Sequence, residues 1–155
     1  MDGWGGGGSV KISRSIETAA SPQRVWPLLV QPKAILEWFT LLERFDYTSE
    51  PPYGPGATFH YEERSGGRLM KCDYRVTDWV ENQRFAFTLT AGPMPKDDQV
   101  WRIEALPAGS RVTLEEDVEL PGRVLGRMLL KLGVGRTIGQ HLDEMLVDLK
   151  RLAEA

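Results

Sequence analysis

Two charged residues occupy positions that the pattern of the sequence marks as inward-facing. Arg14 lies in the alternating segment 10–17, on the side of its isoleucines, and Glu116 alternates with apolar residues in segment 111–120. A charge buried without a partner is costly, so in the first interpretation the two form a pair that orients the polar end of a ligand. A guanidinium suits a carboxylate or enolate oxygen of such a ligand. In the second interpretation a bulge turns Arg14 to solvent, where an ion pair contributes little.

Tyrosine and histidine supply the other candidate groups. Tyr47, Tyr61 and Tyr74 could offer hydroxyls to a ligand, or could be core residues with the hydroxyl at the rim. Histidine is the side chain that exchanges a proton most readily near neutral pH. His60 alternates with aromatic residues and is predicted to face outward, whereas His141 lies at the edge of an apolar helical stripe, at a possible pocket rim. The candidates for catalysis are therefore Arg14, Glu116, Tyr74 and His141.

The sequence contains no motif for a cofactor or for covalent catalysis. It has no nucleophile elbow and no phosphate-binding loop, and the glycine-rich run at residues 3–8 is not followed by a helical pattern. The single cysteine, Cys72, and two widely separated histidines do not form a zinc-binding pattern. We therefore expect neither a metal nor a cofactor, and a protein that binds rather than catalyses.

The composition is that of one globular domain without a nucleic-acid partner. The chain has 155 residues, 41% of them hydrophobic, and a net charge of -3, and this acidity disfavours nucleic-acid binding. One cysteine allows no internal disulfide, and no segment has the length and hydropathy of a signal or membrane span, so a cytoplasmic protein is predicted. Residues 1–9, with four consecutive glycines, are expected to be a flexible tail or linker, and residues 10–155 a single domain.

The N-terminal part of the domain is predicted to be a strand followed by two short helices. Alternation from Val10 onward is typical of a half-buried strand. Ser21 is suited to cap a helix whose first residue is Pro22. Pro27 would either bend that helix or delay its regular part, and Pro32 ends it, so a second short helix follows.

Six further strands and a C-terminal helix are predicted. The strands show apolar alternation with short turns between them, which is typical of an antiparallel meander. They are 44–49, 57–64, 68–80, 84–90, 98–106 and 111–120. Helical periodicity returns after Pro121, with one apolar stripe in 124–132 and a longer one in 138–152, so a short helix and a long C-terminal helix are expected.

Four stretches of the chain, in this order, resemble the START-like (SRPBCC) superfamily and, within it, the polyketide cyclase/dehydrase-like branch. They are SRSIETAASPQRVWPLL, VTDWVENQRFAFTL, GSRVTLEEDVELPG and LVDLKRLAE. The resemblance implies an α+β helix-grip fold, in which a curved seven-stranded antiparallel sheet wraps around the long C-terminal helix and two short helices follow the first strand. It also implies a cavity for an apolar ligand between the sheet and this helix.

The residues expected to line such a cavity lie on the more apolar face of each strand and of the long helix. They are Phe59, Tyr61, Tyr74, Phe87, Trp101, Ile138, His141, Leu142 and Met145. Each of them could instead fill the core. A single helix cannot fill a wide concave surface, however, and this favours a cavity.

We therefore predict a protein that binds an apolar or aromatic small molecule, such as a lipid, a quinone or a polyketide-like compound. The first alternative is a cofactor-independent cyclase or dehydratase, in which the same pocket folds a substrate and the candidate residues move protons. The second is an interaction domain similar to the activators of a chaperone ATPase, which would expose a large apolar patch.

A cationic segment precedes the C-terminal helix. Arg123, Arg127 and Lys131 recur every four residues, and no acidic residue occurs between Glu119 and Asp143. A helix of this kind can rest on an anionic membrane, where each cation contributes about 1 kcal/mol. In the other interpretation the leucines of the segment pack onto the domain and the cations are its solvated side.

Sedimentation with anionic vesicles tests the membrane contact. We expect weak binding at low salt that disappears at high salt, and less binding of the double variant Arg123→Glu/Arg127→Glu. Wild-type protein that stays in the supernatant at low salt, or a double variant that binds equally well, would exclude the contact.

Overall fold

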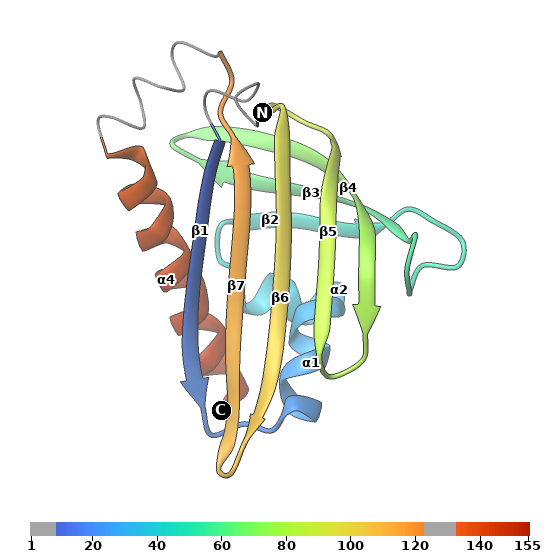
Figure 1. Cartoon of the computed structure of the whole chain (residues 1–155). Helices are drawn as coiled ribbons and strands as arrows, with labels where there is room; N and C mark the ends of the chain where they lie inside the picture. Colours follow the sequence, from blue (N-terminus) through green and yellow to red (C-terminus); the bar gives the residue numbers. More distant parts are fainter. Residues whose placement is uncertain (1–8, 123–132) are drawn as a thin grey trace, which may run out of the picture.

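The structure is a computed structural model that describes residues 9–122 and 133–155. A sheet of seven antiparallel strands curves around a long C-terminal helix, and two short helices lie together near one end of the sheet (Figure 1). The strand order is β1-β7-β6-β5-β4-β3-β2, so the first and last strands of the chain are neighbours. The α+β helix-grip architecture predicted from the sequence is confirmed.

The elements follow one another in the predicted order. They are β1 (Ser9–Thr18), α1 (Pro22–Val30), α2 (Pro32–Trp38), β2 (Leu42–Tyr47), β3 (Thr58–Ser65), β4 (Arg68–Val80), β5 (Arg84–Ala91), β6 (Lys96–Leu106), β7 (Gly109–Glu119) and α4 (Val134–Ala153). The short helix predicted in 124–132 and the cations Arg123, Arg127 and Lys131 lie outside the described residues. No helix within the described ranges is long and apolar enough to cross a membrane.

Prolines set the lengths of the two short helices. Ser21 caps α1, since its side chain accepts a hydrogen bond from the backbone N–H of Arg24 at 3.3 Å, and Pro22 lies in the first turn, where no N–H is needed. α1 starts at Pro22 and continues through Pro27, although Pro27 has no backbone N–H to donate to the preceding turn. Pro32 then starts α2, which means that two separate short helices cover this end of the sheet.

One continuous core lies between the inner face of the sheet and the helices. Alternate strand residues point into it, as the period of two requires. The most deeply buried strand side chains are Phe59, Tyr74, Val76, Val112 and Leu114, and α4 adds Leu142, Met145, Leu146 and Leu149.

The last turn of α4 is bonded to the corner between β1 and α1. The Glu154 carboxylate accepts hydrogen bonds from Thr18 Oγ1 and from the backbone N–H of Ala19, both at 2.8 Å. Arg24 Nε donates to the Ala153 carbonyl at 2.5 Å. These bonds fix the position of the helix at the edge of the sheet.

The hairpin between β6 and β7 packs closely against the same corner. Gly109 has a φ of 140°, and a Cβ at this position would overlap the carbonyl oxygen of Thr18. The neighbouring Ser110 is fully buried and donates to the carbonyl of Ala20 at 2.7 Å. Glycine is therefore required at residue 109 both for its backbone conformation and for its lack of a side chain.

Gly109→Ala should lower the free energy of unfolding. The loss should exceed the roughly 1–2 kcal/mol that a left-handed backbone conformation costs a residue with a Cβ, because the methyl group must also displace backbone atoms. Gly67→Ala is the matched control, since its φ is 82° and nothing lies within 4 Å of the added Cβ. Urea denaturation of both variants measures the difference. Equal losses at the two positions would contradict the close packing at Gly109.

Candidate functional site

Two adjoining cavities lie between the inner face of the sheet and the helices. They share the side chains of Phe39, Tyr61, Gln99 and Met145. The first, called the aromatic cavity here, lies beside α1 and α2 and has a volume of about 30 Å³. The second, called the acidic cavity, lies between β3, β6, β7 and α4 and has a volume of about 240 Å³.

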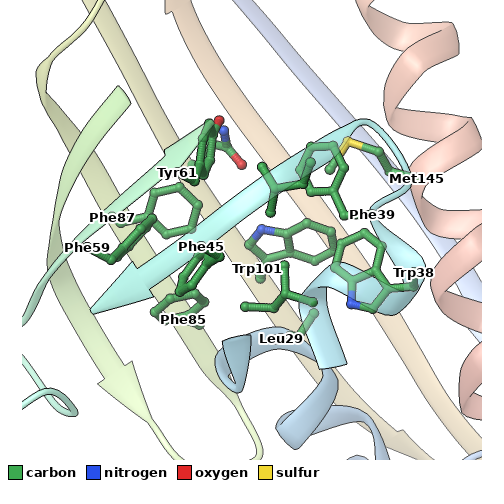
Figure 2. Close-up of a pocket in the computed structure, with 13 residues that line it drawn as sticks. Leu29, Trp38, Phe39, Phe45, Phe59, Tyr61, Phe85, Phe87, Trp101 and Met145 are labelled. Carbon is green, nitrogen blue, oxygen red and sulfur yellow. The ribbon is translucent and has the colours of Figure 1, made fainter. Parts of the chain in front are cut away.

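The aromatic cavity is almost completely filled by side chains. Trp101 lies among the aromatic residues in Figure 2, and its ring meets Trp38 edge-on with centroids 5.6 Å apart. Phe59 stacks on Phe45 with centroids 4.7 Å apart. A volume of about 30 Å³ is far below the roughly 150 Å³ of a cavity that holds benzene. This half of the interior is therefore a packed core.

Polar side chains from four elements gather around the acidic cavity. Glu63 comes from β3, Asp97 and Gln99 from β6, Glu116 from β7 and His141 from α4. Glu63 is 8% exposed and Asp97 is 2% exposed. No lysine or arginine is among the described residues that line this cavity. Its volume of about 240 Å³ exceeds the roughly 150 Å³ of a cavity that holds benzene, so a small ring system fits.

A relay of hydroxyl groups supports Asp97. Tyr74 donates to Asp97 Oδ2 at 2.6 Å, and the Tyr61 hydroxyl lies 2.9 Å from that of Tyr74, so Tyr61 is the donor in this second bond. Gln99 Nε2 adds hydrogen bonds to Asp97 Oδ2 at 3.2 Å and to Glu116 Oε2 at 3.3 Å. Burial raises the pKa of both tyrosines well above the ordinary value, which keeps them protonated as donors.

Asp97, which is buried, and Glu116, which is half-buried, lie on neighbouring strands and accept hydrogen bonds from the same Gln99 amide. Burial raises the pKa of both, and the charge of Asp97 raises the pKa of Glu116 further. Hydrogen bonds to Asp97 from Tyr74 and Gln99 act against this rise in the pKa of Asp97. The rise in pKa is therefore opposed at Asp97 and reinforced at Glu116.

His141 faces Glu63 across the rim of the acidic cavity. Its Nε2 lies 3.5 Å from Glu63 Oε2, and this interaction raises the pKa of His141. The imidazole also lies beside Phe39, with ring centroids 6.2 Å apart. The negative charge of Glu63 is thus partly compensated, whereas Asp97 has no cationic neighbour among the described residues that line the cavity.

Of the nine residues predicted to line a cavity, eight lie in the walls of these two: Phe59, Tyr61, Phe87, Trp101, Ile138, His141, Leu142 and Met145. Tyr74 is not in either wall, because it is fully buried behind Asp97. The predicted apolar cavity is present in part: many of its expected aromatic residues are packed together, and the open part combines apolar walls with carboxyl groups. The role of the eight residues in ligand binding stays a prediction.

The predicted pair of Arg14 and Glu116 is not formed. Glu116 lies opposite Ile12 in the register of β1 and β7, and no bulge interrupts this register. The Arg14 side chain, 40% exposed, reaches α4 instead, with its Nε 3.4 Å from Asp143 Oδ1. Gly139 makes room for it, because a Cβ there would overlap the guanidinium. Arg14 is therefore no candidate for a ligand or for proton transfer inside the cavity.

The predicted site lacks several residues of the acidic cavity, among them the polar residues Glu63, Asp97 and Gln99. Glu63 lies on the same inward face of β3 as Phe59 and Tyr61. In β6, Gln99 and Asp97 lie two and four residues before Trp101 and share its inward face. The alternation of the two strands therefore identifies these residues as inward-facing. Asp97 is missing from the predicted site because β6 starts two residues before the predicted strand and Asp97 lies in this extension.

The convex face of the sheet carries the other histidine, as predicted. The ring nitrogens of His60 lie 2.8 Å from Glu62 Oε2 and 2.8 Å from Asp73 Oδ1, and these hydrogen bonds raise the pKa of His60. His60 therefore belongs to a surface network. Among residues 9–122 and 133–155, no three His, Cys, Asp or Glu side chains are grouped so that they could hold a metal ion.

A family model described as "Polyketide cyclase / dehydrase and lipid transport" matches residues 9–154. The chain belongs to this family. The fold of the family is one that binds hydrophobic ligands, in agreement with an interior cavity between sheet and helix. An uncharacterized protein of Mycobacterium tuberculosis is 28% identical over 114 residues, which cover 70% of this chain and 65% of that relative. The chain thus spans a little under two thirds of the length of the curated relatives it matches.

Solved structures share the fold of this family member over almost its full length. A START superfamily protein from Mycobacterium smegmatis superposes with a TM-score of 0.75 at 19% identity, covering 94% of this chain and 97% of that one. The Zhui aromatase/cyclase from Streptomyces sp. R1128 gives a TM-score of 0.72 at 18% identity, covering 95% and 97%. At these identities the similarity concerns the fold alone.

Glu116→Gln should stabilise the protein increasingly as the pH rises above about 4.5, the ordinary pKa of a glutamate. The folded-state pKa of Glu116 is raised, so its contribution to stability is complete below the unfolded-state pKa and is lost as the pH rises through the folded-state value. Glutamine cannot ionise and still offers an N–H donor to Asp97. The gain at high pH should be on the order of 1 kcal/mol or more, since each pKa unit corresponds to about 1.4 kcal/mol.

Urea denaturation between acid and mildly alkaline pH measures this gain. Glu62→Gln on the convex face is the control, because His60 lowers the pKa of Glu62 and the same exchange should there cost stability at neutral pH. A difference between Glu116→Gln and wild type that does not change with pH would contradict the buried pair.

Proposed function

We propose that this protein binds a hydrophobic small molecule, such as a lipid, a quinone or a polyketide-like compound, in the acidic cavity. The observation that carries the proposal is the space of about 240 Å³ between the sheet and α4, next to a core that is otherwise filled. Both the described family and the fold support this class of ligand.

The walls of the acidic cavity suit a ligand that is mostly apolar. Met70, Met94 and Met145 line it together with aliphatic residues, and methionine side chains adapt their shape to a ligand at little cost. The carboxyls and Gln99 occupy one side, so a bound molecule would contact both kinds of surface. This combination of apolar walls with a few convergent polar groups is typical of small-molecule sites.

Binding of 1-naphthalenemethanol, a neutral two-ring probe, tests this proposal. We expect micromolar binding, measured by tryptophan fluorescence quenching. Ile138→Trp should weaken it at least ten-fold, because Ile138 lines the acidic cavity and an indole there would occupy the space. Val147→Trp is the matched control on the same helix, since Val147 is 48% exposed and is not in the wall.

Two results would count against the binding proposal. If wild-type protein does not bind the probe, the acidic cavity is not a hydrophobic binding site. If Ile138→Trp and Val147→Trp bind it equally well, the probe occupies some other part of the molecule.

A cofactor-independent cyclase or dehydratase is the second candidate. The pair of Asp97 and Glu116 favours it, because a carboxyl with a raised pKa can hold a proton near neutral pH and transfer it to a substrate. This candidate would be supported if the protein catalyses the loss of water from an aromatic β-hydroxyketone. The activity should be abolished in Glu116→Gln and retained in Val147→Trp. Binding of the same compound without turnover would support a binding protein.

The third possibility, an interaction domain similar to chaperone-ATPase activators, finds less support. Within the described residues the exposed large hydrophobic side chains are Leu36, Leu41, Tyr53 and Val147. Tyr53 and Val147 lie on different elements from the other two, so these residues do not form one large apolar patch of the kind that marks such an interface.

A further inference from the structure

The charge of the acidic cavity restricts the head group of a ligand. Three of the strands that border the cavity bring a carboxyl to it: Glu63 from β3, Asp97 from β6 and Glu116 from β7. The only basic side chain among the described lining residues is His141 on α4, which faces Glu63. Asp97 and Glu116 have no basic partner among these residues.

Asp97 has an unused acceptor at this site. The residue is 2% exposed and lines the cavity. Its Oδ2 accepts hydrogen bonds from Tyr74 and Gln99, whereas its buried Oδ1 accepts none from any N–H or hydroxyl of the described residues. A buried acceptor left in this state costs free energy, and a ligand that supplies a donor recovers it.

We propose that the ligand of the acidic cavity is a lipophilic amine, whose ammonium group binds between Asp97 and Glu116 and whose rings contact Phe39, Ile138 and Met145. The inference rests on the proposed function and adds the chemical class of the ligand.

An ammonium group fits this position better than a hydroxyl or a carboxylate. It carries up to three N–H donors, enough for Asp97 Oδ1 and for a Glu116 oxygen, and it brings the positive charge that the wall lacks. Any proton held by the two carboxyls passes to solvent when the ammonium group binds, and both carboxyls then accept hydrogen bonds from the ligand. A hydroxyl supplies one donor and no charge. A carboxylate would add another negative charge beside Asp97, and like charges in a buried site repel strongly.

Three naphthalene probes that differ only in the head group test the inference: 1-naphthylmethylamine, 1-naphthalenemethanol and 1-naphthoate. At neutral pH they are a cation, a neutral donor and an anion on the same ring system. Titration calorimetry of the wild-type protein should give the tightest binding for the amine, at least ten-fold tighter than the alcohol, and the weakest for the acid. The alcohol reports on the cavity itself, and the differences between the probes report on the head-group site.

The double variant Asp97→Asn/Glu116→Gln should bind the amine and the alcohol equally, because it keeps the shape of the site and removes its charge. In the single variant Glu116→Gln, the preference for the amine over the alcohol should decrease by a smaller factor. The control is Glu17→Gln/Glu104→Gln, which removes two carboxylates that contact Arg111 on the surface. It should keep the preference for the amine.

The outcomes separate the two proposals. If the alcohol binds and the acid binds as tightly as the amine, the lipophilic amine is excluded and the binding function stands. If the amine preference persists in the double variant, or is lost in the surface control, the amine does not bind at Asp97 and the inference is wrong. If none of the three probes binds, both proposals fail.

Discussion

The inner face of the seven-stranded sheet is wider than one helix can cover, and the remaining structure follows from this constraint. α4 covers the side next to β1, where its last turn is bonded to Thr18 and Ala19. α1 and α2 cover another part with Trp38 and its aromatic neighbours, and there the interior is filled. Between β3, β6, β7 and α4 neither set of helices fills the space, and the acidic cavity is what remains.

The polar groups of that cavity are held in place at a cost in stability. Two carboxyls that are removed from water lose their hydration, and buried ionic groups can often be replaced by apolar residues without loss of stability. The structure limits the cost through the hydroxyls of Tyr61 and Tyr74 and through the amide of Gln99. An arrangement of this kind contributes little to folding, which favours a role in recognising a ligand.

The elements of the fold could be predicted from the sequence because their signals are local. Alternation from Met70 to Val76 identifies β4, whose predicted bounds 68–80 are those of the structure, and the prolines locate α1 and α2. The acidic cavity could be predicted only in part. Tyr61, His141 and Met145 lie on apolar faces that the pattern identifies, whereas Asp97 follows a lysine in a stretch that resembles a turn.

The position of Arg14 shows a second limit of the sequence signal. Its inward alternation in β1 is real, but its partner is decided by the packing of α4 against the sheet edge and by the space above Gly139. Neither of these is visible in the spacing of charges along the chain. Contacts between distant elements of this kind depend on the tertiary structure, which a local pattern does not contain.

The division of the interior into a filled half and an open half has a consequence for divergence within the family. Substitutions among the packed aromatic residues disturb many close contacts at once and are removed by selection for stability. Substitutions around the open half disturb few, so the groups that contact a ligand can change while the scaffold persists. Homologues with this architecture can therefore drift to new ligands through a handful of inward-facing strand positions.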